Sequence, residues 1–342
     1  MRVLPNTLVG TYPARGPKLV QILTFDEAIV DAHKKCDEIS VLLGNGFSID
    51  YDPAIFAYDS LANEADLAAL SIDKEALFEA LGSSNFEVVI DKLCSAVTIE
   101  RLYGGDQDLA DRLDADALAV RNGLADVLAA RHPESALSLT DDEAFHAREF
   151  LSNFRRIFTL SYDLLLYWVM NRVTPGVHVV KSDGFEWPSF YDRDRLIWKM
   201  KPSRPQRVFF LHGALHMFVN EKRRLTKISY GSDGPLVESL RERLDALDYP
   251  LIVTEGTRVE KEARIDKSSY LRAGLRRLGE IEGGLFVHGV SLSPNDDHIL
   301  EQIEAETSLV RALYVSIHGD ARSRANRELM ERAQAIKSRR RY

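Results

Sequence analysis

The sequence predicts an α/β fold, with a Rossmann-like, mainly parallel sheet and an inserted all-helical subdomain. Short apolar runs of four or five residues recur along the chain and are continuous rather than alternating, as in strands that helices cover on both faces. Most runs are followed by glycine or a small polar residue and then by a helical pattern, which is the rhythm of a doubly wound sheet. Between the first and second runs lies a long stretch of helical periodicity, which predicts the insertion.

The amino-terminal part, residues 1–37, is expected to be an extended lead-in followed by one helix. Thr24 and Glu27 have the spacing of a capping box and predict a helix that runs to about Cys36. Residues 39–43 then form a β-branched and aliphatic run that stops at a glycine, as a buried strand does.

Residues 61–153 are expected to form the helical insertion. Ser84 with Glu87, and Thr140 with Glu143, repeat the capping-box spacing and predict two helix starts. Residues 38–60 and 154–320 make up the expected Rossmann-type domain, whose further strands are predicted at 156–160, 207–211, 250–254, 284–288 and 312–316. Residues 321–342 are expected to be a C-terminal helix and a solvated basic tail.

Composition and charge argue against several classes of protein. The chain has 342 residues, of which 45% are hydrophobic and 28% charged, which is ordinary for a globular protein with a sizeable core. Its net charge of −8 disfavours direct binding of nucleic acid. The longest apolar run, 164–170, is too short to span a membrane, and no secretory pattern follows Met1, so we expect a cytoplasmic protein without a membrane partner. A four-thiolate zinc site is excluded, because the chain has only two cysteines. The sequence leaves open whether the protein forms homo-oligomers.

The loops that follow the strands carry the candidate site. In an open parallel sheet, ligands bind beyond the carboxyl ends of the strands, where the residues that follow each strand meet. These residues are largely glycines and small polar side chains, at positions 44–48, 161–163, 212–213, 255–257 and 289–292. We therefore expect one small-molecule site at this edge of the sheet.

Gly44-Asn45-Gly46-Phe47-Ser48 is the candidate phosphate loop. Glycines allow close approach of the backbone to a diphosphate, consecutive amides can form an anion-binding nest, and a following helix adds its positive end. The alternative is a plain tight turn. The loop is not the G-x-G-x-x-G of ordinary dehydrogenases, because residue 49 is Ile, and it lacks the lysine of a P-loop.

His212 is the candidate general base, because an imidazole titrates near neutral pH, and its alternative is a hydrogen-bonded structural histidine. His216 is near enough in sequence to suggest a metal pair with His212, but no carboxylate or cysteine cluster joins them, so no metal is expected. Asp163 is read as a catalytic group or as the cap of the next helix. Asp296 and Asp297 are read as acids that complement the dipole of the helix they open.

Four of these loops, taken in order, resemble those of the sirtuin-like superfamily, and more closely its bacterial branch without zinc. The loop 44–48 is similar to Gly-Ala-Gly-x-Ser, and Thr159-Leu160-Ser161-Tyr162-Asp163 to Thr-x-Asn-Tyr-Asp. His212-Gly213 is similar to the catalytic His-Gly, and Gly289-Val290-Ser291 to the Gly-x-Ser of the adenosine-ribose loop. The chain also resembles a bacterial family recognisable by the Leu-Leu-Gly-Asn-Gly-Phe-Ser, Tyr-Asp-Leu-Leu-Leu-Tyr-Trp and Asn-Asp-Asp-His-Ile motifs, here at 42–48, 162–168 and 295–299. The resemblance covers about residues 38–320.

This resemblance implies NAD as substrate or ligand and no metal cofactor. Catalysis would fall to His212 with Ser161 and Asp163, and NAD would be bound by Gly44, Asn45, Gly46, Phe47, Ser48, Thr159, Gly213, Gly289 and Ser291. The implied activity is N-glycosidic hydrolysis of NAD to nicotinamide and ADP-ribose, as prokaryotes use in antiphage defence. The family asparagine at the nicotinamide ribose is Ser161 here, which favours the alternative, a non-catalytic sensor module for NAD or ADP-ribose. An oxidoreductase is disfavoured because the dehydrogenase fingerprint is missing.

Overall fold

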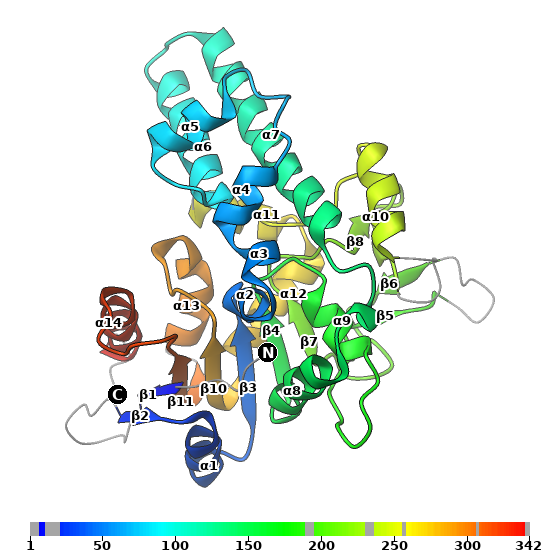
Figure 1. The fold of residues 1–342 in the computed structure, drawn as a ribbon, viewed down its shortest axis with the longest axis vertical. Coiled ribbons are helices and arrows are strands. Elements are labelled where there is room, and N and C mark those ends of the chain that lie inside the picture. The colour runs from blue at the N-terminus through cyan, green and yellow to red at the C-terminus, as the bar shows by residue number, and fades with distance from the viewer. Residues whose placement is uncertain are drawn as a thin grey trace.

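The computed structural model describes residues 7–10, 21–188, 195–229, 236–254, 258–305 and 308–338 (Figure 1). The described strands are β1 (Thr7–Gly10), β2 (Gln21–Leu23), β3 (Ile39–Leu43), β4 (Arg156–Thr159), β5 (Phe185–Glu186), β6 (Leu196–Trp198), β7 (Val208–Phe210), β8 (Met217–Val219), β9 (Leu225–Lys227), β10 (Glu282–His288) and β11 (Leu309–Ser316). They form a 7-stranded sheet in the order β2-β1-β11-β10-β3-β4-β7 and a 4-stranded sheet in the order β5-β6-β9-β8.

The larger sheet confirms the predicted α/β fold with a mainly parallel, Rossmann-like sheet. Strands β11, β10, β3, β4 and β7 run parallel to one another. Strands β1 and β2 add an antiparallel edge beside β11, so part of the expected lead-in belongs to the sheet. The smaller sheet, which the sequence analysis did not predict, is antiparallel and is built from strands of two or three residues.

The helices of the described residues cover the sheet, and some of them extend beyond the carboxyl ends of its parallel strands (Figure 1). They are α1 (Phe25–Lys35), α2 (Gly46–Tyr51), α3 (Pro53–Phe56), α4 (Tyr58–Glu64), α5 (Lys74–Leu81), α6 (Phe86–Leu102), α7 (Gln107–Arg131), η1 (Ala136–Ser138), α8 (Asp141–Ser152), α9 (Leu165–Asn171), α10 (Leu236–Asp245), α11 (Arg258–Asp266), α12 (Ser269–Gly279), η2 (Pro294–Asp296), α13 (Asp297–Glu304) and α14 (Arg324–Ser338). None of them combines the length and apolar character that crossing a membrane requires.

Alternate residues of the strands face two separate cores, because successive side chains of a strand point to opposite faces. Val41 and Leu43 of β3 join the core shared with α1 and α8, whereas Leu42 joins the core shared with α12, α13 and α14. Burial on both faces explains why β3 reads as a continuous apolar run.

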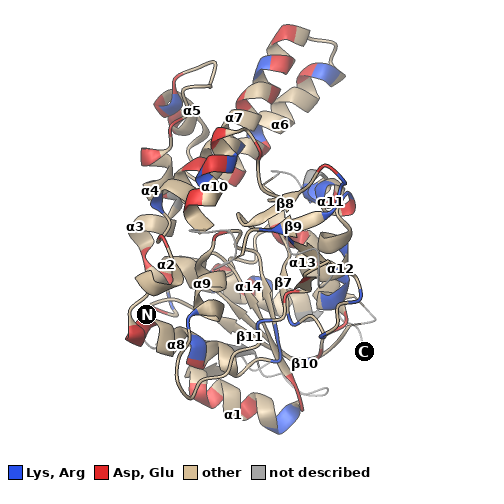
Figure 2. Ribbon diagram, turned by 90° about the vertical axis from the view of Figure 1, so that its right-hand side faces the viewer, with Lys and Arg blue, Asp and Glu red and all other residues tan. Residues whose placement is uncertain are grey.

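Helices α4 to α8 lie between β3 and β4 in sequence, in the region predicted to be helical. The long helices α6 and α7 pack along each other and project past the carboxyl ends of the strands, as two views at right angles agree (Figures 1 and 2). The base of this pair therefore faces the strand ends, where the candidate loops lie.

Two of the three predicted capping boxes are present. Thr24 with Glu27, and Thr140 with Glu143, make both reciprocal hydrogen bonds at the starts of α1 and α8. The predicted box of Ser84 with Glu87 is wrong. Asn85 caps α6, accepting a hydrogen bond from the amide of Glu87 at 2.9 Å, while the hydroxyl of Ser84 donates to Asp59.

The predicted parallel strand at 250–254 is also wrong. Ile252 forms an isolated antiparallel bridge with Gly213, and the segment otherwise exchanges scattered hydrogen bonds with residues 212–217. The sheet ends at β7. Residues 250–254 do not add a strand beside β7, because their backbone hydrogen bonds go to residues 212–217, which follow β7.

Candidate functional site

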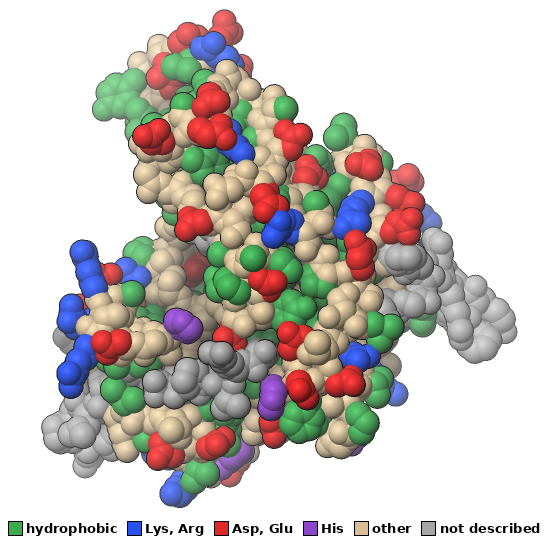
Figure 3. Space-filling model, in the orientation of Figure 1, with side chains coloured by type: hydrophobic (Ala, Val, Ile, Leu, Met, Phe, Trp, Pro, Cys, Tyr) green, Lys and Arg blue, Asp and Glu red, His purple; other side chains and the backbone are tan. Residues whose placement is uncertain are grey.

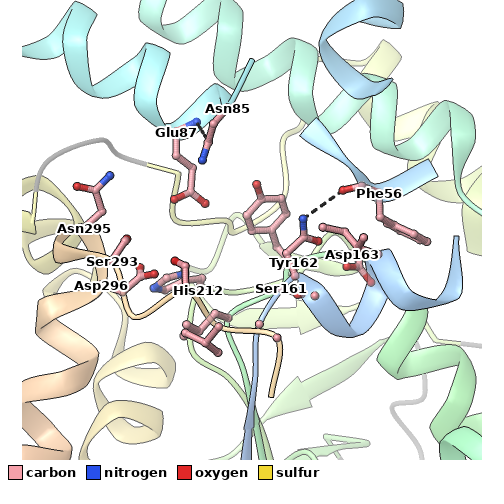
Figure 4. A pocket seen from close by; sticks show the side chains of 18 of the residues that line it. Phe56, Asn85, Glu87, Ser161, Tyr162, Asp163, His212, Ser293, Asn295 and Asp296 are labelled. Carbon is pink, nitrogen blue, oxygen red and sulfur yellow. Dashed lines mark hydrogen bonds between the residues drawn. The ribbon is translucent and has the colours of Figure 1, made fainter. Parts of the chain in front are cut away.

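A cavity of about 290 Å³ lies at the carboxyl ends of β3, β4, β7 and β10 (Figure 4). Four of the five loops predicted to converge line it, and the fifth, 255–257, lies outside the described residues. The helices close the opposite wall through Phe56, Leu61, Asn85, Glu87 and Leu128. In Figure 3 the surface is hollowed on the left of the view, between the α6–α7 pair and the region of α13.

The glycines of the loop 44–48 are required by contact between two loops. A β-carbon on Gly44 would lie 2.3 Å from the carbonyl oxygen of Gly289, and one on Gly46 would lie 2.5 Å from the α-carbon of Gly289. The backbones of the two loops therefore touch directly, which explains why both loops are glycine-rich.

The amides of this loop are mostly engaged within the protein. Gly44 donates to His288 and Gly46 to Gly289, while Phe47 and Ser48 donate to carbonyl oxygens of the loop itself. An anion-binding nest made by these amides, as the sequence analysis predicted, would require those hydrogen bonds to break. Gly44, Asn45 and Gly46 line the cavity, whereas Phe47 and Ser48 are buried beneath it.

Asp163 fastens this loop to the helix that follows β4. Its carboxylate accepts a hydrogen bond from the hydroxyl of Ser48 at 2.7 Å and from the amide of Leu165, the first residue of α9, at 2.7 Å. Burial raises the pKa of the Asp163 carboxyl, against the effect of these hydrogen bonds. The side chain lines the cavity and its contacts position the loop and the start of α9, but the N-cap residue of that helix is Leu164 and not Asp163.

Ser161 presents the clearest unsatisfied group of the site. The amide of Ser161 donates a hydrogen bond to the hydroxyl of Thr159 at 3.1 Å, at the point where the chain leaves β4. Thr159 itself is buried. The Ser161 hydroxyl itself is buried and has no hydrogen-bond partner among the described residues. Because Ser161 lines the cavity, a bound ligand is the natural partner for this hydroxyl.

His212 lines the cavity and is only 2% exposed. Burial, followed by the ammonium of Lys261 and the ring of His298, holds the pKa of His212 well below its usual value. Its Nε2 atom lies 3.1 Å from Nε2 of His298. The imidazole is therefore neutral at pH 7 but already hydrogen-bonded, so the predicted role of a free general base is not the one its contacts favour.

The neighbours of His212 in sequence have structural surroundings. Gly213 has a φ of +75° and does not line the cavity; a β-carbon on it would lie 1.9 Å from the carbonyl oxygen of Leu251. His216 is fully buried and stacks on Tyr167. The described residues contain no group of three or more His, Cys, Asp or Glu side chains arranged to hold a metal ion.

Gly289-Val290-Ser291, the predicted adenosine-ribose loop, lines the cavity. Gly289 has a φ of +68°, and its amide donates to the hydroxyl of Ser316 at 3.1 Å. Ser291 is exposed at the cavity, and its carbonyl oxygen accepts a hydrogen bond from Arg332 at 3.2 Å.

A buried ionic cluster, which no sequence pattern predicts, forms part of the cavity wall. Lys261 of α11 is fully buried, with its ammonium 3.0 Å from Glu87 of α6 and 3.2 Å from Asp296 of η2. Burial lowers the pKa of Lys261, but the two carboxylates together raise it above its usual value, so the ammonium stays charged. Glu87 and Asp296 also line the cavity. The sequence predicts Glu87 and Asp296 only as acids at helix starts. Lys261 lies in a charged helix whose sequence gives no signal of burial.

Comparison with known proteins gives a family without a stated function. Residues 41–341 match the family model described as a domain of unknown function, DUF4917. No curated protein matches the chain.

Proposed function

This chain belongs to the DUF4917 family, and we propose that its cavity binds NAD and hydrolyses it to nicotinamide and ADP-ribose. The observation that carries the proposal is the meeting of Ser161, His212 and Glu87 in one cavity at the carboxyl ends of parallel strands. This is where open α/β sheets bind nucleotides. In Figure 4 the carboxylate of Glu87 points from α6 into the space above the strand ends, on the side opposite Ser161 and His212.

The chemistry requires groups that tolerate positive charge on a ribose. The bond between C1′ and the pyridinium nitrogen breaks, and nicotinamide leaves as a neutral molecule with the bonding electron pair. The ribose becomes oxocarbenium-like until water adds at C1′ and one proton is released. A carboxylate beside C1′ stabilises this state more than bound NAD, which is the condition for catalysis. Glu87, which lines the cavity, would take that role.

The other cavity residues would hold the substrate. The unpartnered hydroxyl of Ser161 and the ring of His212 would contact ribose hydroxyls at the reacting end. Ser291 and Asn295, on the rim, would contact the adenosine side. Asp163 would act by keeping the loop 44–48 in position. The cavity volume of about 290 Å³ is near the lower bound for small-molecule sites, which suits the nicotinamide ribose with the remaining dinucleotide along the rim.

Calorimetric titration with NAD and with ADP-ribose tests the binding half of this proposal. Ser161→Ala should weaken binding about two- to thirteenfold, because one ligand hydrogen bond contributes about 0.5–1.5 kcal/mol. Ser95→Ala on α6, outside the cavity, is the matched control and should bind as the parent does. A parent protein that binds neither nucleotide would refute the proposal.

The second candidate function is a sensor that binds NAD or ADP-ribose without cleaving it. Two observations favour it: the serine at position 161, where the sirtuin-like resemblance expects asparagine, and the engagement of His212 with His298. A sensor would bind both nucleotides in the titration above and release no nicotinamide.

A further inference from the structure

His212 and His298, which lie in separate sequence motifs, form a buried pair. His212 follows β7 and His298 lies on α13, and their exposed fractions are 2% and 1%. Their Nε2 atoms are 3.1 Å apart, and the rings are nearly parallel, with centroids 5.3 Å apart and an angle of 22° between the planes. The two side chains come from different elements and meet through their Nε2 atoms, and of the two only His212 lines the cavity.

Two neutral imidazoles that face each other through Nε2 share one hydrogen. One ring must donate and the other must accept, because a neutral imidazole carries its proton on a single nitrogen. Burial is the main reason that both rings are neutral. Burial lowers the pKa of His298 to about 4, with Asp296 and Glu262 acting against this and Lys261 and Arg258 reinforcing it. Burial, Lys261 and His298 lower the pKa of His212, and only the hydrogen bond with the backbone of Leu160 opposes them.

The direction of the shared hydrogen bond follows from the two remaining nitrogens. Nδ1 of His298 is buried and has no partner among the described residues. A buried N–H without an acceptor is rarer than an acceptor without a donor, so the proton of His298 belongs on Nε2. His212 then accepts at Nε2 and carries its own proton on Nδ1, the nitrogen left for the carbonyl oxygen of Leu160.

We infer that His298 caps Nε2 of His212 and holds His212 in the Nδ1–H form, which makes His298 a positioning residue and His212 a hydrogen-bond donor to the ligand. The Nδ1–H form of His212 is inferred for the protein without ligand. The role of His212 in catalysis rests on the proposed NAD hydrolysis. A ligand oxygen in the cavity, which Leu160 also lines, would take the Nδ1 hydrogen from that carbonyl. His212 would thereby bind a ribose oxygen without removing its proton.

Nitrogen NMR of the full chain with ¹⁵N-labelled histidine tests this inference without any activity assay. In the parent protein at pH 7, His212 should show a protonated Nδ1 and an unprotonated Nε2. His298→Leu should remove the hydrogen bond and move the Nε2 resonance downfield, and His298→Gln, whose amide can donate, should move it back. His288→Leu is the control, because His288 is a buried histidine with no hydrogen-bond partner among the described residues and lies outside the cavity.

Each outcome bears on a separate statement. A parent His212 protonated at Nε2, or an Nε2 resonance that His298→Leu leaves unmoved, would overturn the inference whatever the protein does with NAD. If nicotinamide is released, His298→Leu should slow release on the order of tenfold, as loss of a tautomer-fixing partner does elsewhere, and His298→Gln should recover most of it. If the predicted NMR pattern is observed but no nicotinamide is released, the inference about His298 and His212 is supported and the proposed NAD hydrolysis is contradicted.

Discussion

The α-carbon of Gly289 occupies the space that a side chain on Gly46 would need: a β-carbon on Gly46 would lie 2.5 Å from it. Each of the two loops is glycine-rich because the other is there. The sequence motif that first suggested a diphosphate cradle therefore has a packing explanation, which holds whether or not a nucleotide binds nearby.

Gly46→Val should accordingly destabilise the fold as well as any binding. Overpacking typically costs about 1–3 kcal/mol in free energy of unfolding, and here the obstacle is backbone rather than a movable side chain. Denaturant unfolding measures the change. Gly279→Ala is the control, because its nearest new contact, at 3.3 Å, is the flexible end of Gln302. Equal stability of Gly46→Val and the parent would contradict this explanation.

Lys261→Met should destabilise the protein by about 3–5 kcal/mol, because it leaves the carboxylates of Glu87 and Asp296 without their buried cation. The loss should shrink when Glu87→Gln is combined with it, since only the carboxylate of Asp296 then remains without its buried cation. A double-mutant cycle on the free energy of unfolding measures this coupling. Additive effects of the two substitutions would mean that the Lys261–Glu87 contact contributes nothing.

Stability should fall as the pH is lowered from about 6.5 towards 4. Burial lowers the pKa values of His132, His288 and His298 to about 4, and it lowers those of His212 and His216 as well. The unfolded chain binds protons on these histidines at a pH where the folded chain does not. Stability is therefore fully present above the unfolded pKa of about 6.5, and each histidine lowers it by up to about 1.4 kcal/mol per pH unit below that.

Unfolding free energies at pH 7 and pH 5 check this dependence, which Asp163 partly opposes because burial raises its pKa. His288→Leu should flatten it, while substitution of the half-exposed His146 by Gln should not. A parent protein equally stable at both values would show that these histidines are not held neutral.

Ser161→Asn restores the residue that the sirtuin-like resemblance expects, and it separates the two candidate functions. An amide reaches further than a hydroxyl and can both donate and accept, so nicotinamide release by a hydrolase should stay level or rise. In a sensor, the same substitution is the change expected to start turnover. A fall in release of tenfold or more, with the fold intact, would contradict the placement of Ser161 at the ribose.

The sequence predicted the parts of this protein that local chemistry determines. The strand 39–43 is buried on both faces and so reads as continuous apolar sequence, and Thr24 and Thr140 begin helices through neighbours three residues away. The prediction at 250–254 failed because an apolar run does not reveal which backbone already holds its hydrogen-bond partners.

The site divides in the same way. Ser161, His212 and Gly289 were found because residues after parallel strands gather at one edge of the sheet. Lys261 and Glu87 are 174 residues apart, and His212 and His298 are 86 apart. Such pairs depend on how α6, α11 and α13 pack around the cavity, and no local pattern encodes that packing.

Incubation of the purified protein with NAD, following free nicotinamide, tests the central claim most directly. The hydrolase account predicts steady release by the parent. It also predicts a loss of about 10²-fold or more for His212→Ala, with calorimetric NAD affinity changed only modestly, because a donor that acts in the transition state contributes mainly to rate. A parent protein that binds NAD and releases no nicotinamide above the uncatalysed background would contradict hydrolysis and leave the sensor.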